Sequence, residues 1–174
     1  MNDKAAVIGQ LKIRFAEDKD TDTIFNFIKE LAEFEKLSGD VKATKEMLLR
    51  NIFEKKYAEV LIAEYDSVPA GFALFFHNFS TFVGKPGIYL EDLYVKPEYR
   101  RKGVGRQLLI CLARLAVERD CGRFEWAVLD WNEKAIAFYK SIGAKPMDEW
   151  TVFRVAGKEL DLLAQQSCPG WKAG

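Results

Sequence analysis

The junction at residues 88–106 constrains the fold of this chain more than any other feature. An apolar run from Ile88 to Val95 is followed by Pro97, by a basic turn that contains Gly103 and Gly105, and at once by an amphipathic helix. The unpaired N–H groups at the start of a helix and the positive end of its dipole attract anions. This order of strand, loop and helix therefore predicts a binding site for an anionic phosphate.

The charge of this junction is local. Five basic side chains and one acidic side chain lie between residues 96 and 106, although the whole chain has a formal net charge of zero. A neutral chain has no general attraction for nucleic acids or for anionic membranes. We therefore expect neither as a partner, and we assign the basic cluster to a ligand bound at the junction.

Length and composition predict one soluble domain. The chain has 174 residues, of which 49% are hydrophobic, enough for a sizeable core. We expect a single domain at residues 1–166 and a loosely ordered tail at residues 167–174. The first residues lack the apolar segment of a signal peptide, and no run reaches transmembrane length. Cys111, Cys121 and Cys168 show no metal-ligand spacing, which favours free thiols in a reducing, cytoplasmic setting.

The hydrophobic periodicity predicts a mixed sheet with helices on both faces. Strands are expected at residues 11–15, 59–65, 70–79, 88–95, 123–129 and 150–155. Helices are expected at residues 21–34, 44–53, 104–119, 133–141 and 158–165. The strands at 59–65 and 70–79 should pair as a hairpin, and the strand at 88–95 should lead through the long central helix to the strand at 123–129.

Two segments resemble the GCN5-related N-acetyltransferase (GNAT) family. The segment Arg100-Arg101-Lys102-Gly103-Val104-Gly105 resembles the acyl-CoA signature of that family, R/Q-x-x-G-x-G/A. The segment from Val128 to Tyr139, with Asn132 as a helix cap, is similar to the family's second cofactor-contacting region. Residues 28–35, 89–92 and 131–139 resemble, more narrowly, the diamine (spermidine/spermine) and thialysine N-acetyltransferases, a similarity that runs from about residue 11 to residue 163.

The resemblance implies an α/β GNAT fold, with a mostly antiparallel central sheet of six to seven strands and a splayed cofactor slot. It implies transfer of an acetyl group from acetyl-CoA to a primary amine of a small cationic substrate, a diamine, polyamine or lysine-like amino acid, by direct attack in a ternary complex. It also implies a homodimer, and no metal is expected. The cofactor-binding residues that it implies are Leu93, Tyr94, Val95, Arg100, Arg101, Lys102, Gly103, Val104, Gly105, Arg106, Asn132, Glu133, Lys134, Ala135 and Tyr139.

The reaction needs a base and an acid. A primary ammonium has a pKa near ~10.4, so a base must remove its proton at neutral pH. The resemblance assigns this role to Glu91, which could instead bind the second charge of a diamine. The family has a bulge in this strand, without which Asp92 would point to the opposite face. By the same resemblance, Tyr139 protonates the leaving thiolate, and backbone N–H groups of residues 93–95 stabilise the carbonyl oxygen.

Acidic and aromatic side chains are expected around the amine, because acids attract polycations and aromatic faces attract cations. The substrate-binding residues implied by the resemblance are Phe34, Glu35, Glu91, Asp92, Glu125, Trp126, Ala127 and Asp148. Phe34 stands where the subfamily often has Tyr, and Arg101-Lys102 replaces a Gly-aromatic pair. His77 is the only histidine, which excludes a histidine-based triad with spare ligands.

Two other functions are compatible with the sequence. A protein-lysine or N-terminal acetyltransferase would use the same fold with a peptide groove, and a non-catalytic acyl-CoA-binding module would keep the phosphate loop without turnover. The hypothesis that this loop binds a nucleotide has less support, because the chain has no G-x-x-x-x-G-K-[ST] pattern and the glycine spacing differs from that of a dinucleotide site.

Overall fold

A computed structural model describes residues 10–171 of the chain. The chain forms two compact units, one up to Ala127 and one from Val128 onward. The first contains the sheet and its flanking helices, and the second contains two short helices. The single domain at residues 1–166 and the loosely ordered tail at residues 167–174 stay predictions.

The first unit is built on a mixed, mostly antiparallel sheet in the order β1-β2-β3-β4-β5. The strands are β1 (Leu11–Phe15), β2 (Glu59–Tyr65), β3 (Val68–Ser80), β4 (Lys85–Val95) and β5 (Arg123–Trp126). Neighbours from β1 to β4 are antiparallel, and β5 runs parallel to β4. The predicted hairpin and the mixed sheet are confirmed. β2 and β3 are joined at Asp66 and Ser67, which both have positive φ.

The number of strands differs from the expected six to seven. The described residues contain five strands, and residues 150–155 form no strand. β5 ends at Trp126, although the strand was expected to reach residue 129. The alternation of apolar residues at 150–155 therefore indicated a strand that has no partner in the described chain, and a strand needs a neighbour for its backbone hydrogen bonds.

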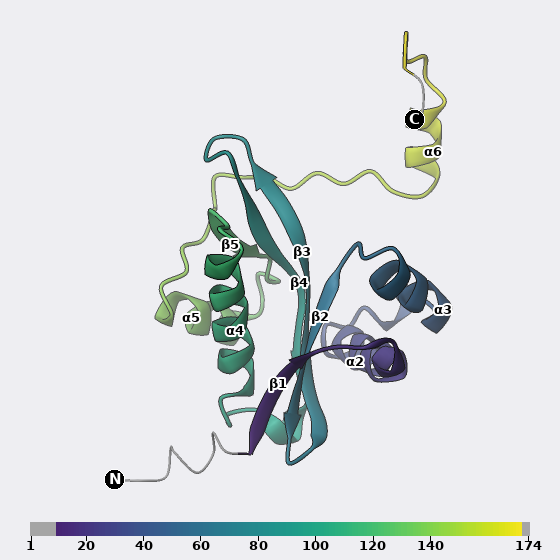
Figure 1. Cartoon of the computed structure of the whole chain (residues 1–174). Coiled ribbons are helices and arrows are strands. Elements are labelled where there is room, and N and C mark those ends of the chain that lie inside the picture. Colours follow the sequence, from purple (N-terminus) through teal and green to yellow (C-terminus); the bar gives the residue numbers. More distant parts are fainter. Residues whose placement is uncertain (1–9, 172–174) are drawn as a thin grey trace. The chain divides into compact units, whose positions relative to one another are not determined.

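Helices cover both faces of this sheet, as predicted (Figure 1). One face carries α2 (Thr21–Phe34) and α3 (Lys45–Leu48), and the other carries α4 (Val104–Glu118). The helix expected at residues 44–53 is divided, because α3 continues into a π-helical segment, Leu49–Glu54. Short 3-10 helices lie at Asp18–Asp20, Ser38–Asp40 and Pro97–Tyr99.

The apolar stripe of α2 explains its position. Ile24, Phe27 and Leu31 recur at helical spacing and are buried against the sheet. The ring of Phe27 stacks on that of Phe72, with 5.4 Å between centroids. Burying an aromatic side chain of this size stabilises the fold by roughly 1.5–3 kcal/mol. On the other face, α4 buries Val104, Leu108, Leu109, Leu112 and Ala116.

The second unit contains α5 (Glu133–Ser141) and α6 (Lys158–Ala164). The side chain of Asn132 accepts a hydrogen bond from the amide of Ala135 at 3.3 Å, so the predicted N-cap is confirmed. Gly143 follows the helix with φ of 92°, a left-handed conformation that favours glycine at a helix end. In residues 10–171, no helix has both the length and the apolar character to cross a membrane.

Candidate active site

The site is built around a bulge in β4. Leu74 of β3 pairs with Asp92, and the next residue, Phe75, pairs with Leu90. Glu91 is therefore an extra residue without an opposite partner on β3, the arrangement of a β-bulge. The bulge that the resemblance implied is confirmed.

β4 and β5 separate at the same point. Their parallel pairing runs only from Gly87 to Leu90 of β4, opposite Arg123–Trp126 of β5. Beyond Leu90, β4 has β3 on one side and no strand of the described chain on the other. This is the splayed slot that the GNAT resemblance implied.

The backbone beyond the bulge presents polar groups to this slot. The amide of Lys96 donates to the carbonyl of Ala70 at 2.9 Å, so Lys96 faces β3. Backbone groups alternate along a strand, and Val95 and Leu93 therefore point their N–H and C=O groups to the side away from β3. The role of these amides at a carbonyl oxygen stays a prediction.

The loop after β4 forms the start of α4. Gly103, the N-cap of α4, has φ of 81° and ψ of 0°, and it offers no side-chain acceptor to the first turn. The N–H groups of Val104, Gly105 and Arg106 have no acceptor within the helix. Arg101 also has a positive φ, of 63°. Left-handed residues beside exposed amides form a concave anion site, so the loop fits the pyrophosphate of a coenzyme.

One basic side chain of this loop contacts an aromatic ring of β2 and another of the 3-10 helix that precedes the loop. The ammonium of Lys102 lies 4.8 Å from the ring centroid of Tyr65 and 5.0 Å from that of Tyr99. Arg101 and Arg106 are exposed. The phosphate-binding roles expected of the loop side chains stay predictions.

Three carboxylates gather at the bulge. Tyr94 packs against Phe27 of α2, and Asp92, two residues earlier on the strand, projects to the same face. Burial, the charge of Glu91 and the charge of Glu35 raise the pKa of Asp92 to about 6. Glu35, the C-cap of α2, also has a raised pKa, because of burial. Glu91 is exposed. The structure thus brings together the three acids that the resemblance implied.

Asp92 is the most enclosed of these acids. Sequence reasoning gave it only a substrate-binding role and named Glu91 as the base. A bulge resets the alternation of side chains along a strand, and the residue sequence alone does not place it. The base role of Glu91 stays a prediction, and Asp92 is a second candidate for that role.

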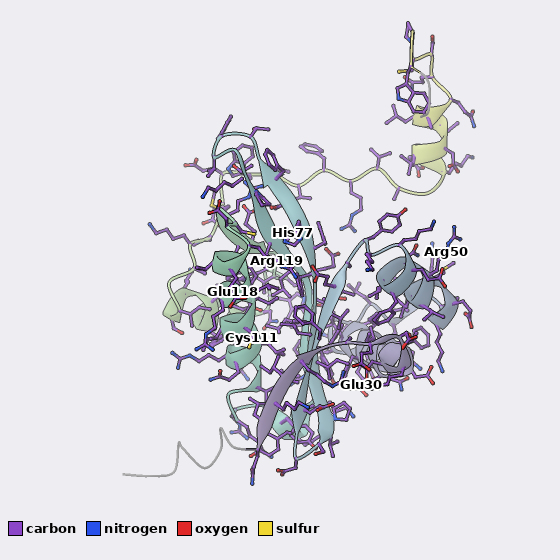
Figure 2. The ribbon with its side chains drawn as sticks, viewed as in Figure 1. Glu30, Arg50, His77, Cys111, Glu118 and Arg119 are labelled. Atoms are coloured by element: carbon purple, nitrogen blue, oxygen red, sulfur yellow. The ribbon has the colours of Figure 1, made fainter. Side chains whose placement is uncertain are left out.

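Aromatic residues border the acids on the α2 face. Burial raises the pKa of Tyr94 to about 12, and the charge of Glu30 and a hydrogen bond with Glu30 act in the same direction. Glu30 lies on the side of the sheet that carries α2 (Figure 2). The guanidinium of Arg100 lies over the ring of Phe34 at 4.7 Å and is 5.8 Å from the ring centroid of Tyr94. The sequence gave no signal for this contact between loop and helix.

The expected substrate residues of β5 have their own contacts. Glu125 accepts a hydrogen bond from the side chain of Asn78 at 2.8 Å and forms an ion pair with Arg123 at 2.9 Å. The Trp126 ring lies 4.8 Å from that of Phe124, and Ala127 is exposed. Their roles at the amine stay predictions.

The remaining expected site residues belong to the second unit. Tyr139 lies in α5 beside Phe138, with ring centroids 5.6 Å apart, and burial raises the pKa of its hydroxyl. Asn132 caps that helix, whereas Glu133, Lys134 and Asp148 are exposed. Because these residues belong to a different unit from the loop, their roles at the cofactor and substrate stay predictions.

No other site of comparable chemistry was found among residues 10–171. They contain no group of three or more His, Cys, Asp or Glu side chains able to hold a metal ion. A surface hollow of about 320 Å³ is lined by Asp18, Lys19, Thr21, Asp22, Lys45, Glu46 and Leu49. Another, of about 220 Å³, is lined by Ile13, Arg14, Phe15, Leu61, Cys111, Arg114, Leu115 and Glu118. Neither includes a bulge or loop residue, so the candidate site rests on the β4 geometry.

Comparisons with known proteins agree with this geometry. Residues 22–144 match the model of the acetyltransferase (GNAT) family. The chain is 40% identical to the thialysine N-epsilon-acetyltransferase of Sus scrofa, over 87% of this chain and 96% of that protein. It is 46% identical to an L-ornithine N5-acetyltransferase of Arabidopsis thaliana, over 56% of this chain and 43% of that protein.

A solved structure supports the fold. An integron cassette protein from the mobile metagenome of V. cholerae superposes with a TM-score of 0.76 and 29% identity, over 90% of this chain and 99% of that one. The family match spans α2 to α5 and so includes both the bulged strand and the phosphate loop. Together these matches show that the chain belongs to the acetyltransferase (GNAT) family and is an N-acetyltransferase.

Proposed function

We propose that this enzyme acetylates a primary amine of a small substrate with a second positive charge, such as a thialysine-like or lysine-like amino acid, ornithine or a polyamine. The observation that carries the proposal is the group of three carboxylates, Glu35, Glu91 and Asp92, at the β4 bulge. A single ammonium needs one negative charge, so three acids favour a substrate with more than one cationic group. The relatives named for thialysine and ornithine support this class.

The loop before α4 and the slot beside β4 bind the acetyl donor. When bound, acetyl-CoA supplies the acetyl group as a thioester. The amides at the start of α4 bind its pyrophosphate, and Gly103 holds the left-handed turn that exposes them. The N–H groups of Leu93 and Val95 donate to the carbonyl oxygen of the acetyl group.

Asp92 and Tyr139 handle the protons. With a pKa of about 6, Asp92 is ionised at neutral pH and accepts the proton of the substrate ammonium, directly or through water. The freed amine attacks the carbonyl carbon, so that a C–N bond forms. The nitrogen then releases its second proton to water as the C–S bond breaks. Tyr139, whose raised pKa keeps it protonated, gives its proton to the departing sulfur. Glu91 binds the distal charge of the substrate.

A turnover screen tests this function. The protein is assayed for thiol release from acetyl-CoA with thialysine, lysine, ornithine, putrescine, spermidine and spermine, and with a lysine peptide library. We expect kcat/KM to be at least ten-fold higher for the dications and polyamines than for monoamines of equal length. A preference for peptides would support the protein-lysine alternative, and no turnover with any amine would support a non-catalytic module.

The assembly that we propose is a homodimer in the cytoplasm. Apolar side chains of the second unit are exposed, including Trp150 at 71%, Val152 at 86% and Phe153 at 89%. A second copy that covers such a segment would remove it from water. Cys111, Cys121 and Cys168 form no disulfide, which fits a reducing compartment. Light scattering should give the dimer mass, and Phe153→Glu should shift it toward the monomer; a monomeric wild-type protein would contradict the dimer.

A further inference from the structure

Arg100 begins the acyl-CoA signature, but its side chain is directed toward the amine side of the sheet. Its Nε donates to the carbonyl oxygen of Val95 at 2.9 Å. Its guanidinium lies over the ring of Phe34 at 4.7 Å and near that of Tyr94 at 5.8 Å. Arg100 is exposed, and these contacts favour one orientation of its planar guanidinium.

The contact joins two parts of the site. Phe34 is the last residue of α2, and the next residue, Glu35, is one of the acids that act on Asp92. Arg100 belongs to the loop between β4 and α4. The contact between Arg100 and Phe34 therefore connects the loop to the helix end that positions an acid of the amine site.

The end of α2 is closed by backbone hydrogen bonds, from Lys36 to Glu33 and from Leu37 to Ala32, and it also accommodates a positive charge. Its terminal turn passes through Lys36, which has φ of 61°, a left-handed conformation that costs free energy in any residue except glycine. The last turn of α2 has no basic residue of its own. The guanidinium of Arg100 brings a positive charge to the last residue of the helix, where the helix dipole favours it.

Arg100 brings this positive charge to the end of α2 without neutralising Glu35, Glu91 or Asp92. The charges that affect the pKa of Asp92 are those of Glu91 and Glu35, and the pKa of Glu35 is raised by burial alone. The charge of Arg100 acts instead on Tyr94, whose pKa it lowers against the larger effects of burial and Glu30. The three carboxylates therefore remain available to a cationic substrate.

We infer that Arg100 is a positioning residue of the amine site: it holds Phe34, and through Phe34 it fixes Glu35 beside Asp92. This inference rests on the proposed function, and it gives Arg100 a role different from the phosphate contact expected from the signature. It predicts that the ring of Phe34 and the planar guanidinium of Arg100 act as one unit, so that losing either has the effect of losing both.

The test compares Arg100→Lys, Phe34→Leu and the double variant. Lysine keeps the positive charge but cannot stack as a planar group, and leucine keeps an apolar side chain without a ring. We expect each single variant to raise the KM for the amine at least five-fold, with a less than two-fold change in the Kd for acetyl-CoA. The KM of the double variant should stay within two-fold of the single variants, because coupled residues are not additive.

A matched control accompanies these variants. Lys29 lies over Phe25 at 4.9 Å, a similar contact on the same helix but outside the site, and Lys29→Gln should leave both constants unchanged. If Arg100→Lys weakens acetyl-CoA binding while Phe34→Leu changes neither constant, Arg100 is a phosphate ligand and the inference is wrong. The inference is also wrong if the effects of the two substitutions on KM multiply in the double variant.

A second readout is independent of the proposed substrate. If the wild-type protein acetylates no amine, the proposed function fails, and the inference is judged from the melting temperatures of the same four proteins. We then expect the decrease in Tm of the double variant to equal that of the larger single variant. Additive decreases would show that Arg100 and Phe34 do not act together.

Discussion

Asp92 lies near enough to Glu35 for the charge of Glu35 to raise its pKa, although one residue comes from β4 and the other from the end of α2. The proximity depends on the bulge at Glu91 and on the length of α2, which ends at Phe34. An acid held with a pKa of about 6 is ionised at neutral pH and still basic enough to accept a proton.

Turnover should increase as the pH rises through about 6, because Asp92 accepts a proton only in its ionised form. In the Asp92→Asn variant this limb of the pH profile should disappear, and kcat should fall at least about ten-fold. The measurement is kcat/KM from pH 5 to pH 9 at saturating acetyl-CoA. An unchanged limb in the variant would assign the ionisation to another group.

The same substitution should stabilise the folded protein at neutral pH. The pKa of Asp92 is about 6 in the folded state and 3.8 as its ordinary value, so the folded state binds more protons between these two pH values. Stability is therefore lost as the pH rises from about 4 to about 6, and Asp92→Asn should recover about 1–3 kcal/mol above that range. Urea unfolding at pH 4 and pH 7.5 measures the difference.

The exposed Glu91 provides the comparison for that experiment. Glu91→Gln should change the free energy of unfolding by less than about 0.5 kcal/mol, because surface substitutions are usually close to neutral. Equal stabilisation by both variants would mean that burial of Asp92 is not the cause.

Glu91→Gln should weaken the use of diamines more than that of monoamines. In the proposed function this carboxylate binds the distal ammonium, which a monoamine lacks. The ratio of kcat/KM for a diamine and a monoamine of equal length should fall several-fold. If both values fall equally, Glu91 accepts the proton of the attacking amine instead, the role that the resemblance first implied.

Tyr139→Phe should reduce kcat at least about ten-fold and leave the affinity for acetyl-CoA nearly unchanged. Burial raises the pKa of this phenol, so it remains a proton donor throughout the neutral range. Calorimetry with acetyl-CoA and steady-state rates separate the two quantities. A kcat equal to that of the wild type across the pH range would exclude Tyr139 as the acid.

The two glycines of the loop should respond differently to substitution. Gly103 has φ of 81°, which proline cannot adopt, so Gly103→Pro should abolish acetyl-CoA binding. A Cβ at Gly105 would lie 3.6 Å from the Val95 side chain, an ordinary contact, so Gly105→Ala should fold and bind normally. Tight binding by Gly103→Pro in a calorimetric titration would contradict the loop as the phosphate site.

The sequence predicted the elements whose pattern is local. The apolar spacing of Ile24, Phe27 and Leu31 gave α2, and Gly103 before an amphipathic run gave the start of α4. The cap at Asn132 was predicted for the same reason, because a cap depends on residues within one turn. Such features need no information about the rest of the fold.

Features that depend on neighbouring elements could not be predicted from the residues. The position of the bulge depends on the register between β3 and β4, and only the family resemblance indicated it. The contact between Arg100 and Phe34 joins a loop to a distant helix, and no spacing in the sequence signals it. The strand expected at residues 150–155 failed because alternation identifies a candidate strand but not its partner.

The outer strand β1 has a consequence for how the protein behaves at high concentration. Only Leu11–Phe15 form this strand, and Lys12 is exposed on it. A short edge strand with an exposed lysine disfavours pairing with a strand of another molecule, which leads to aggregation. The sheet therefore has a protected edge at β1 and an unpaired stretch of β4 beyond Leu90, where we propose that the coenzyme binds.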